Sequence, residues 1–147
     1  PVSFILSGLP RTAELASMDE QFERRALFAQ RPSIQMPDDQ DVVKKMITEL
    51  AAAADLDFAE AIGGDLPDRI AHAANYRQGR IATLLHAVID IALEYKDSAL
   101  KRDHFSQAYV ERSHAFGKDN KNPFLIDDWN YLEPGSVIFE RGISFDR

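Results

Sequence analysis

The sequence contains no cysteine, which excludes disulfide bonds, thiolate catalysis, iron–sulfur clusters and cysteine-ligated zinc sites. Basic residues are in the minority: 17 lysines and arginines stand against 24 aspartates and glutamates, and the net charge is -7. The chain therefore lacks the overall basic excess expected of a protein that binds duplex DNA unaided. DNA could still be reached through a partner.

Motifs that carry catalysis are also missing. No phosphate-binding loop of the Gly-x-x-x-x-Gly-Lys-Ser/Thr type occurs, because Gly117-Lys118 is followed by Asp119 and lacks the upstream glycine. Neither G-x-G-x-x-G nor G-x-S-x-G is present. The histidines show no H-x-x-x-H spacing, so we expect no metal site and expect side chains at solvent edges or only partly packed. They are His72, His86, His104 and His114.

The ends of the chain suggest a piece of a longer protein. It opens on Pro1 without an initiator methionine, and residues 2–6 form an apolar run with no upstream neighbour. That run is far shorter than the about 20 residues of a transmembrane helix, and it lacks the basic start of a secretion signal. We therefore expect a cytoplasmic protein with no membrane partner.

The first 37 residues are predicted to be the remnant of an α/β core. Residues 2–7 form a short, mostly apolar run with β-branched and aromatic residues, as in a buried strand, and Ser17 with Glu20 has the spacing of a helix capping box. The resulting helix should run to about Phe28. Residues 33–36 then resume as a short extended segment after Arg31-Pro32.

Residues 38–115 are predicted to form a helical domain. Asp38 and Asp39 should cap the first helix, and Asp65 with Pro67 marks the start of the second. The third is the strongest, because apolar residues keep the helical period over more than three turns. These are Ile81, Leu84, Leu85, Val88, Ile89, Ala92 and Leu93. A fourth helix is expected over residues 103–114, and residues 56–62 could add a further turn or two.

Residues 116–147 are predicted to be an irregular tail rich in aromatic residues, and a small hairpin is possible around Pro134-Gly135. The aromatic content is too high for a solvating segment. Two interpretations are open: the tail packs back on the helices, or it docks a partner. For the second, Trp129 and Tyr131 are the candidate partner-binding residues.

Two basic features are candidates for binding phosphate. Arg24-Arg25 ends a predicted helix, where the pair either reaches a phosphate on a neighbouring molecule or simply complements the helix dipole. Arg77 and Arg80 open the strongest helix, where backbone N–H groups also favour an anion. Cations are unfavourable at that end of a helix unless an anion compensates them, so two interpretations are open: the pair binds phosphate, or the arginines are ordinary surface charges.

This order of elements resembles the second half of an AAA+ ATPase module. Residues 2–10 resemble the core strand that carries the sensor 1 position, and residues 15–25 resemble the helix and arginine stretch before the last core strand, here residues 33–36. The following helices resemble the four-helix lid. The resemblance thus implies a mainly α fold, with a lid-like bundle, a short remnant of the α/β core and the aromatic tail.

Within the AAA+ proteins, residues 2–115 resemble the TniB-type transposition helper ATPases. By this resemblance, Arg24 or Arg25 matches the arginine finger that acts on a neighbouring subunit, and Ser7 matches sensor 1. Gly79 and Arg80 match the sensor 2 region. Many relatives place an arginine three residues after this glycine, where Ala82 stands here, so either Arg80 or Arg77 substitutes or sensor 2 is missing.

The resemblance implies a regulator that binds ATP and Mg2+, self-associates, assembles on DNA and helps to recruit or activate a transposase. The Walker A and Walker B elements are not present, so we expect this chain alone neither to bind nor to hydrolyse ATP. Two other interpretations are open. One is an all-α protein-interaction module without nucleotide function; the other is a helical DNA-binding accessory domain, which the net charge disfavours.

Overall fold

The computed structural model divides the chain into two compact units, Pro1–Pro32 and Ser33–Arg147, and describes residues 33–113 and 116–135. All the described residues belong to the second unit. The strand expected at residues 2–7 and the helix expected at residues 17–28 lie outside them.

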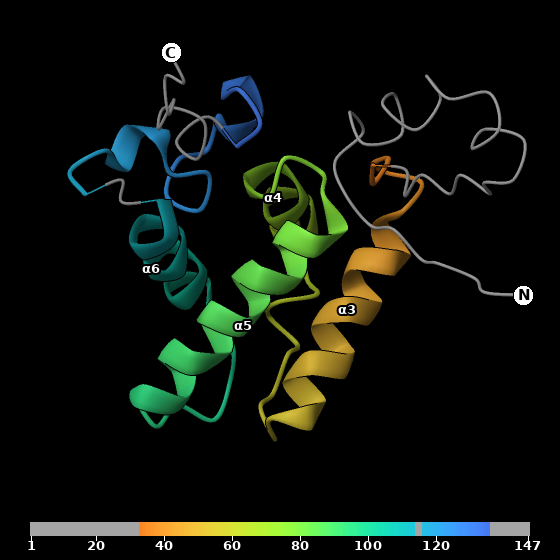
Figure 1. Ribbon diagram of the computed structural model, residues 1–147, viewed down its shortest axis with the longest axis vertical. Coiled ribbons are helices and arrows are strands. Elements are labelled where there is room, and N and C mark those ends of the chain that lie inside the picture. Colours follow the sequence, from red (N-terminus) through yellow and green to blue (C-terminus); the bar gives the residue numbers. More distant parts are fainter. Residues whose placement is uncertain (1–32, 114–115, 136–147) are drawn as a thin grey trace, which may run out of the picture. The chain divides into compact units, whose positions relative to one another are not determined.

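The described part of the chain is mainly helical and contains no strand. The expected mainly helical fold is confirmed: there are four α-helices, followed by two short 3-10 helices (Figure 1). They are α3 (Gln40–Ala53), α4 (Leu66–Ala73), α5 (Gln78–Glu94), α6 (Arg102–Ser113), η1 (Asp119–Lys121) and η2 (Trp129–Tyr131). Over the described residues, no helix is both long enough and apolar enough to span a membrane.

Helix α5 lies at the centre of the unit and packs against α3, α4 and α6 (Figure 1). The predicted stripe from Ile81 to Ala92 is buried, as the helical period requires. Leu93 is the exception, since it is 50% exposed in the last turn of α5, where no described segment covers it. A single central helix thus supplies most of the surface on which the other three assemble.

Helices α3, α4 and α5 end in the same way, with a residue other than glycine in the left-handed conformation. Asp55, Asn75 and Lys96 have φ angles of 57°, 51° and 57°. The N–H group one residue later bonds back into each helix, for example from Tyr76 to the carbonyl of Ala71 at 2.8 Å. This is the Schellman pattern, which satisfies carbonyls left open at a helix end.

The connection between α3 and α4 is hydrogen-bonded to the connection between α5 and α6. Asp57 donates its N–H to Ser98 O at 2.9 Å and accepts from Leu100 N–H at 2.8 Å, forming an isolated parallel bridge. The Glu60 carboxylate then accepts the Arg102 N–H at 2.8 Å and so binds an open donor at the start of α6. Residues 56–62 form turns and no named helix, but Ile62 N–H donates to Phe58 O at 3.1 Å, so one turn of helical spacing is present there and a second is not.

The extended segment at residues 33–36 does not form the strand of a core sheet. Ile34 is 8% exposed, and its N–H donates to the carbonyl of Tyr76 at 2.8 Å. The segment therefore pairs with the connection between α4 and α5, within the helical unit.

The start of α3 also differs from expectation. Asp39 occupies the N-cap position, but its side chain makes no capping bond to the helix. Its carboxylate instead accepts the N–H of Gln35 at 2.7 Å. The acidic residue thus stabilises the turn before the helix, while its own N–H donates to Gln35 O at 2.7 Å.

Candidate functional site

Of the residues proposed from the sequence to handle a nucleotide, Arg77, Gly79 and Arg80 lie together at the start of α5. Ser7, Arg24 and Arg25 lie outside the described residues. The candidate site is therefore built from the junction of α4 and α5 and from the segment packed against it.

Two consecutive residues with positive φ shape this junction: Asn75 at 51° and Tyr76 at 55°. Such angles are uncommon for residues with a side chain, and together they turn the chain sharply between the two helices. Hydrogen bonds hold Tyr76 on both sides, to Ala71 O within α4 and from Ile34 N–H. After this turn, Arg77 lies at the N-cap position of α5 in an extended conformation.

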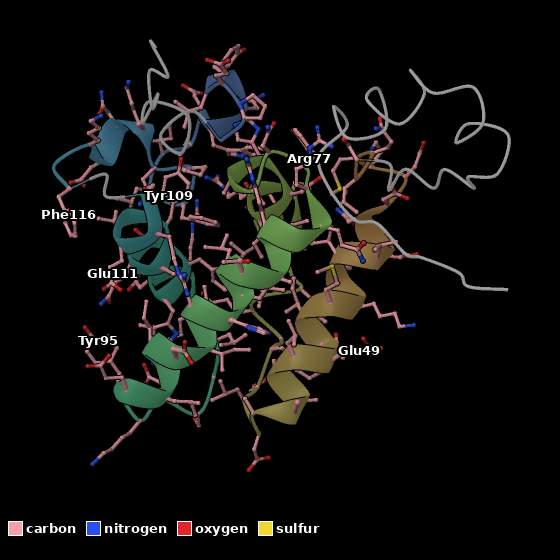
Figure 2. The ribbon with its side chains drawn as sticks, viewed as in Figure 1. Glu49, Arg77, Tyr95, Tyr109, Glu111 and Phe116 are labelled. Carbon is pink, nitrogen blue, oxygen red and sulfur yellow. The ribbon has the colours of Figure 1, made fainter. Side chains whose placement is uncertain are left out.

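A shallow depression of about 280 Å³ lies beside Arg77. Residues 33–36 form one side of it and residues 75–77 the other. Figure 2 shows Arg77 at this end of α5, near the segment that leads into α3. The residues expected to be a core strand and the residues expected to be sensor 2 are therefore brought together.

The first turn of α5 suits an anion. It contains no acidic residue, and no side chain caps its N-terminus. Arg77 is exposed and Arg80 is half-buried, and their spacing of three residues puts them on one side of the helix. Gly79 is exposed, and a Cβ added there would meet nothing within 4 Å. Open N–H groups, the exposed guanidinium group of Arg77 and the space beside Gly79 are features that suit a phosphate group.

A second polar centre, which the sequence did not reveal, holds the segment after α6 in place. We call residues 119–135 the strap. Arg69 of α4 is 3% exposed and donates through one nitrogen to Pro123 O at 2.5 Å and to Ile126 O at 2.6 Å. Its Nε bonds Asp65 at 2.8 Å. A buried arginine with this many partners fixes the strap on α4.

Helix α6 holds the strap from its other side. The Arg102 side chain donates to Phe124 O at 2.7 Å, and the Asn122 side chain donates to Ser106 Oγ at 3.0 Å. Phe124 is 1% exposed, with its ring 5.7 Å from that of Phe105. Figure 1 shows the strap beside the ends of α4 and α6. This part of the tail is integral to the helical unit.

The two candidate partner-binding residues have opposite surroundings. Trp129 is half-buried: its ring lies 5.4 Å from the Arg69 guanidinium and 5.1 Å, edge to face, from His72. Tyr131 is 84% exposed. Trp129 therefore packs back on the helices, while Tyr131 is available at the surface. The hairpin considered at Pro134-Gly135 extends beyond the described residues.

Two histidines expected near solvent are buried. His72 is 3% exposed, and its burial lowers its pKa, an effect that hydrogen bonding to the backbone of Leu132 partly offsets. His104 is 4% exposed. The expectation is wrong for both histidines. The strap covers His72, and the connection between α5 and α6 holds His104. His86 is exposed, and His114 lies outside the described residues.

His104 belongs to a cluster that resembles acid–base machinery but stabilises the fold. Its Nε2 lies 2.9 Å from Asp97, and its Nδ1 accepts the Lys101 N–H at 3.2 Å. Hydrogen bonds from Lys101 and then His104 lower the pKa of Asp97, and the bond to Asp97 raises the pKa of Lys101. With both ring nitrogens occupied, His104 has no atom left for proton transfer to a substrate.

No group of three or more metal-binding side chains occurs among residues 33–113 and 116–135. Comparison of the chain with protein-family models, curated proteins and solved structures found no match.

Proposed function

We propose that this chain is the C-terminal part of a transposon-encoded AAA+ ATP-binding regulator, with α3 to α6 as its lid. The other half of the intact protein would supply the phosphate-binding loop and the Mg2+ ligands. The lid would close over ATP, and its movement would couple the nucleotide state to assembly on DNA and to the recruitment of a transposase. This proposal extends the resemblance seen in the sequence.

The observation that carries the proposal is the start of α5. Exposed Arg77 and half-buried Arg80 lie at an uncapped helix N-terminus beside a depression, as a residue that senses a phosphate would need. A phosphate there would offset the unfavourable placement of cations at this end of the helix. In this proposal, Arg77 at the N-cap or Arg80 in the first turn takes the role of the arginine that relatives carry where Ala82 stands.

The arginine finger would act between subunits. In this proposal, Arg24 or Arg25 reaches the γ-phosphate bound by a neighbour and stabilises the charge that develops during transfer, an effect worth about 10³- to 10⁵-fold in turnover in other phosphate-transfer enzymes. Ser7 would contact the nucleotide from the core. Self-association is then a requirement for turnover.

The test uses the natural full-length protein. Arg77→Ala and Arg80→Ala, combined, should weaken ATP binding or turnover by about tenfold or more, the loss expected for a charge-assisted phosphate contact. Arg112→Ala, which removes an exposed arginine of α6, is the matched control and should leave both unchanged. A full-length protein that binds no ATP would contradict the proposal.

A mixing experiment tests the finger. Arg24→Ala and Arg25→Ala should each be compared with the wild type, and the finger variant should lose turnover while it still binds ATP. Adding a second variant that cannot bind nucleotide but keeps both arginines should restore activity, because the finger then comes from the neighbour. Unchanged turnover in both arginine variants would remove the assignment.

A further inference from the structure

The outer surface of the strap carries exposed side chains that the proposed nucleotide site does not use. In the stretch of residues 125–133, Tyr131 is 84% exposed and Leu125 is 49% exposed. The carboxylates of Asp127, Asp128 and Glu133 are exposed as well. We call these five residues the outer face. An aromatic ring at this exposure is a feature typical of binding surfaces.

The backbone beneath the outer face is fixed. Arg69 holds the carbonyl of Ile126, Trp129 packs over Arg69 and His72, and Gly135 donates its N–H to His72 O at 3.1 Å. Within the strap, Tyr131 N–H bonds Asp128 O at 3.1 Å. Tyr131 is therefore presented on a turn that is anchored at both ends, so binding through it would require little ordering of the chain.

The charge of the outer face has one sign. From Asn122 to Gly135 the sequence contains three acidic residues and no lysine or arginine. The arginines below the strap point inward, where Arg69 and Arg102 donate to the strap carbonyls. A nucleic acid would be repelled by such a face, whereas a positively charged protein segment would be attracted.

We propose that the outer face docks a segment rich in arginine or lysine from a partner protein. A guanidinium group would stack on the exposed ring of Tyr131, and neighbouring cations of the segment would pair with Asp127, Asp128 and Glu133. Leu125 would contact the aliphatic part of these long side chains. This proposal uses no residue of the start of α5, so the two proposals can fail separately.

The experiment measures binding of a short fluorescent peptide of alternating arginine and glycine to the full chain by anisotropy. A peptide of alternating glutamate and glycine should not bind. Tyr131→Ala should weaken binding of the arginine peptide by about tenfold, and Tyr131→Phe should retain it, because the ring faces are similar. Tyr131 is 84% exposed, so neither change should disturb folding, and unchanged Trp129 emission checks this.

A charge-matched pair of variants separates a specific surface from general attraction. Asp127→Asn, Asp128→Asn and Glu133→Gln together should weaken binding by about tenfold, as expected for the loss of several ion pairs. The control, Asp38→Asn, Asp41→Asn and Glu49→Gln, changes the net charge equally at exposed sites on and before α3 (Glu49 in Figure 2) and should weaken binding less than about twofold.

Three results would overturn the proposal. Equal losses in the two triple variants would show attraction by net charge alone. An unchanged affinity in Tyr131→Ala would remove the aromatic contact. Self-association of the chain that Tyr131→Ala abolishes would show that the occupant is a second copy instead.

Discussion

Replacing Arg69 with methionine is the most direct test of how the strap is held. Methionine keeps an unbranched apolar side chain in the buried space, so the change removes hydrogen bonds and charge with little loss of packing. It leaves the carbonyls of Pro123 and Ile126 without their donor. It also removes the contact below Trp129.

The size of the effect follows from the burial of each contact. A hydrogen bond from a charged group contributes about 1.5–3 kcal/mol, and Arg69 is 3% exposed with two such bonds to the strap. The pair with Asp65 adds little, because the Asp65 side chain is 51% exposed. We therefore expect the free energy of unfolding to fall by about 3–5 kcal/mol, a large share of the about 5–15 kcal/mol of a typical domain.

Urea unfolding, followed by two probes, measures this effect. Circular dichroism reports the helices, and fluorescence reports Trp129, which is the sole tryptophan of the chain and lies in the strap. The variant should unfold at lower urea, with Trp129 emission shifted to the red before the transition. Arg112→Met, at an exposed position of α6, should change the free energy by less than about 0.5 kcal/mol. A loss below about 1 kcal/mol with unchanged emission would refute the reasoning.

Two further predictions concern the helix ends and His72. Asp55→Gly and Lys96→Gly should each raise the free energy of unfolding, measured by urea titration, by up to about 1 kcal/mol. Both residues are exposed and have a positive φ, where glycine avoids a steric cost. A loss of stability in both variants would contradict this prediction. Burial lowers the pKa of His72 below 6.5, so the unfolded chain takes up the proton first and stability should fall as pH decreases below about 6.5. His72→Gln should reduce this pH dependence, and an identical pH profile in the variant would assign it to other groups.

The helices were predictable because their signals are local. The apolar period of α5 and the Asp65-Pro67 start of α4 each lie within a short stretch of chain, and each favours a helix from the local sequence alone. The ends were less predictable. Asp55, Asn75 and Lys96 adopt a conformation usually left to glycine, so no residue type marked the stops of α3, α4 and α5.

The candidate site was predictable in part. The sequence placed Arg77, Gly79 and Arg80 at a helix N-terminus, and the structure agrees. It did not predict that residues 33–36 lie beside them, because that contact depends on the burial of Ile34 in the core and on its hydrogen bond to Tyr76, which is far away in the sequence. The spacing of Asp65 and Arg69 predicts a local pair on α4, and nothing in it signals burial under the strap.

By itself, then, the sequence determined where the chain is helical, which faces of the helices are apolar, and which catalytic and metal-binding motifs are missing. The tertiary structure decided which polar residues became buried. Arg69, His72 and His104 belong to types that usually reach water, and only the path of the strap and of the connections between helices encloses them. Burial depends on segments distant in sequence, whereas helical periodicity is complete within the segment itself.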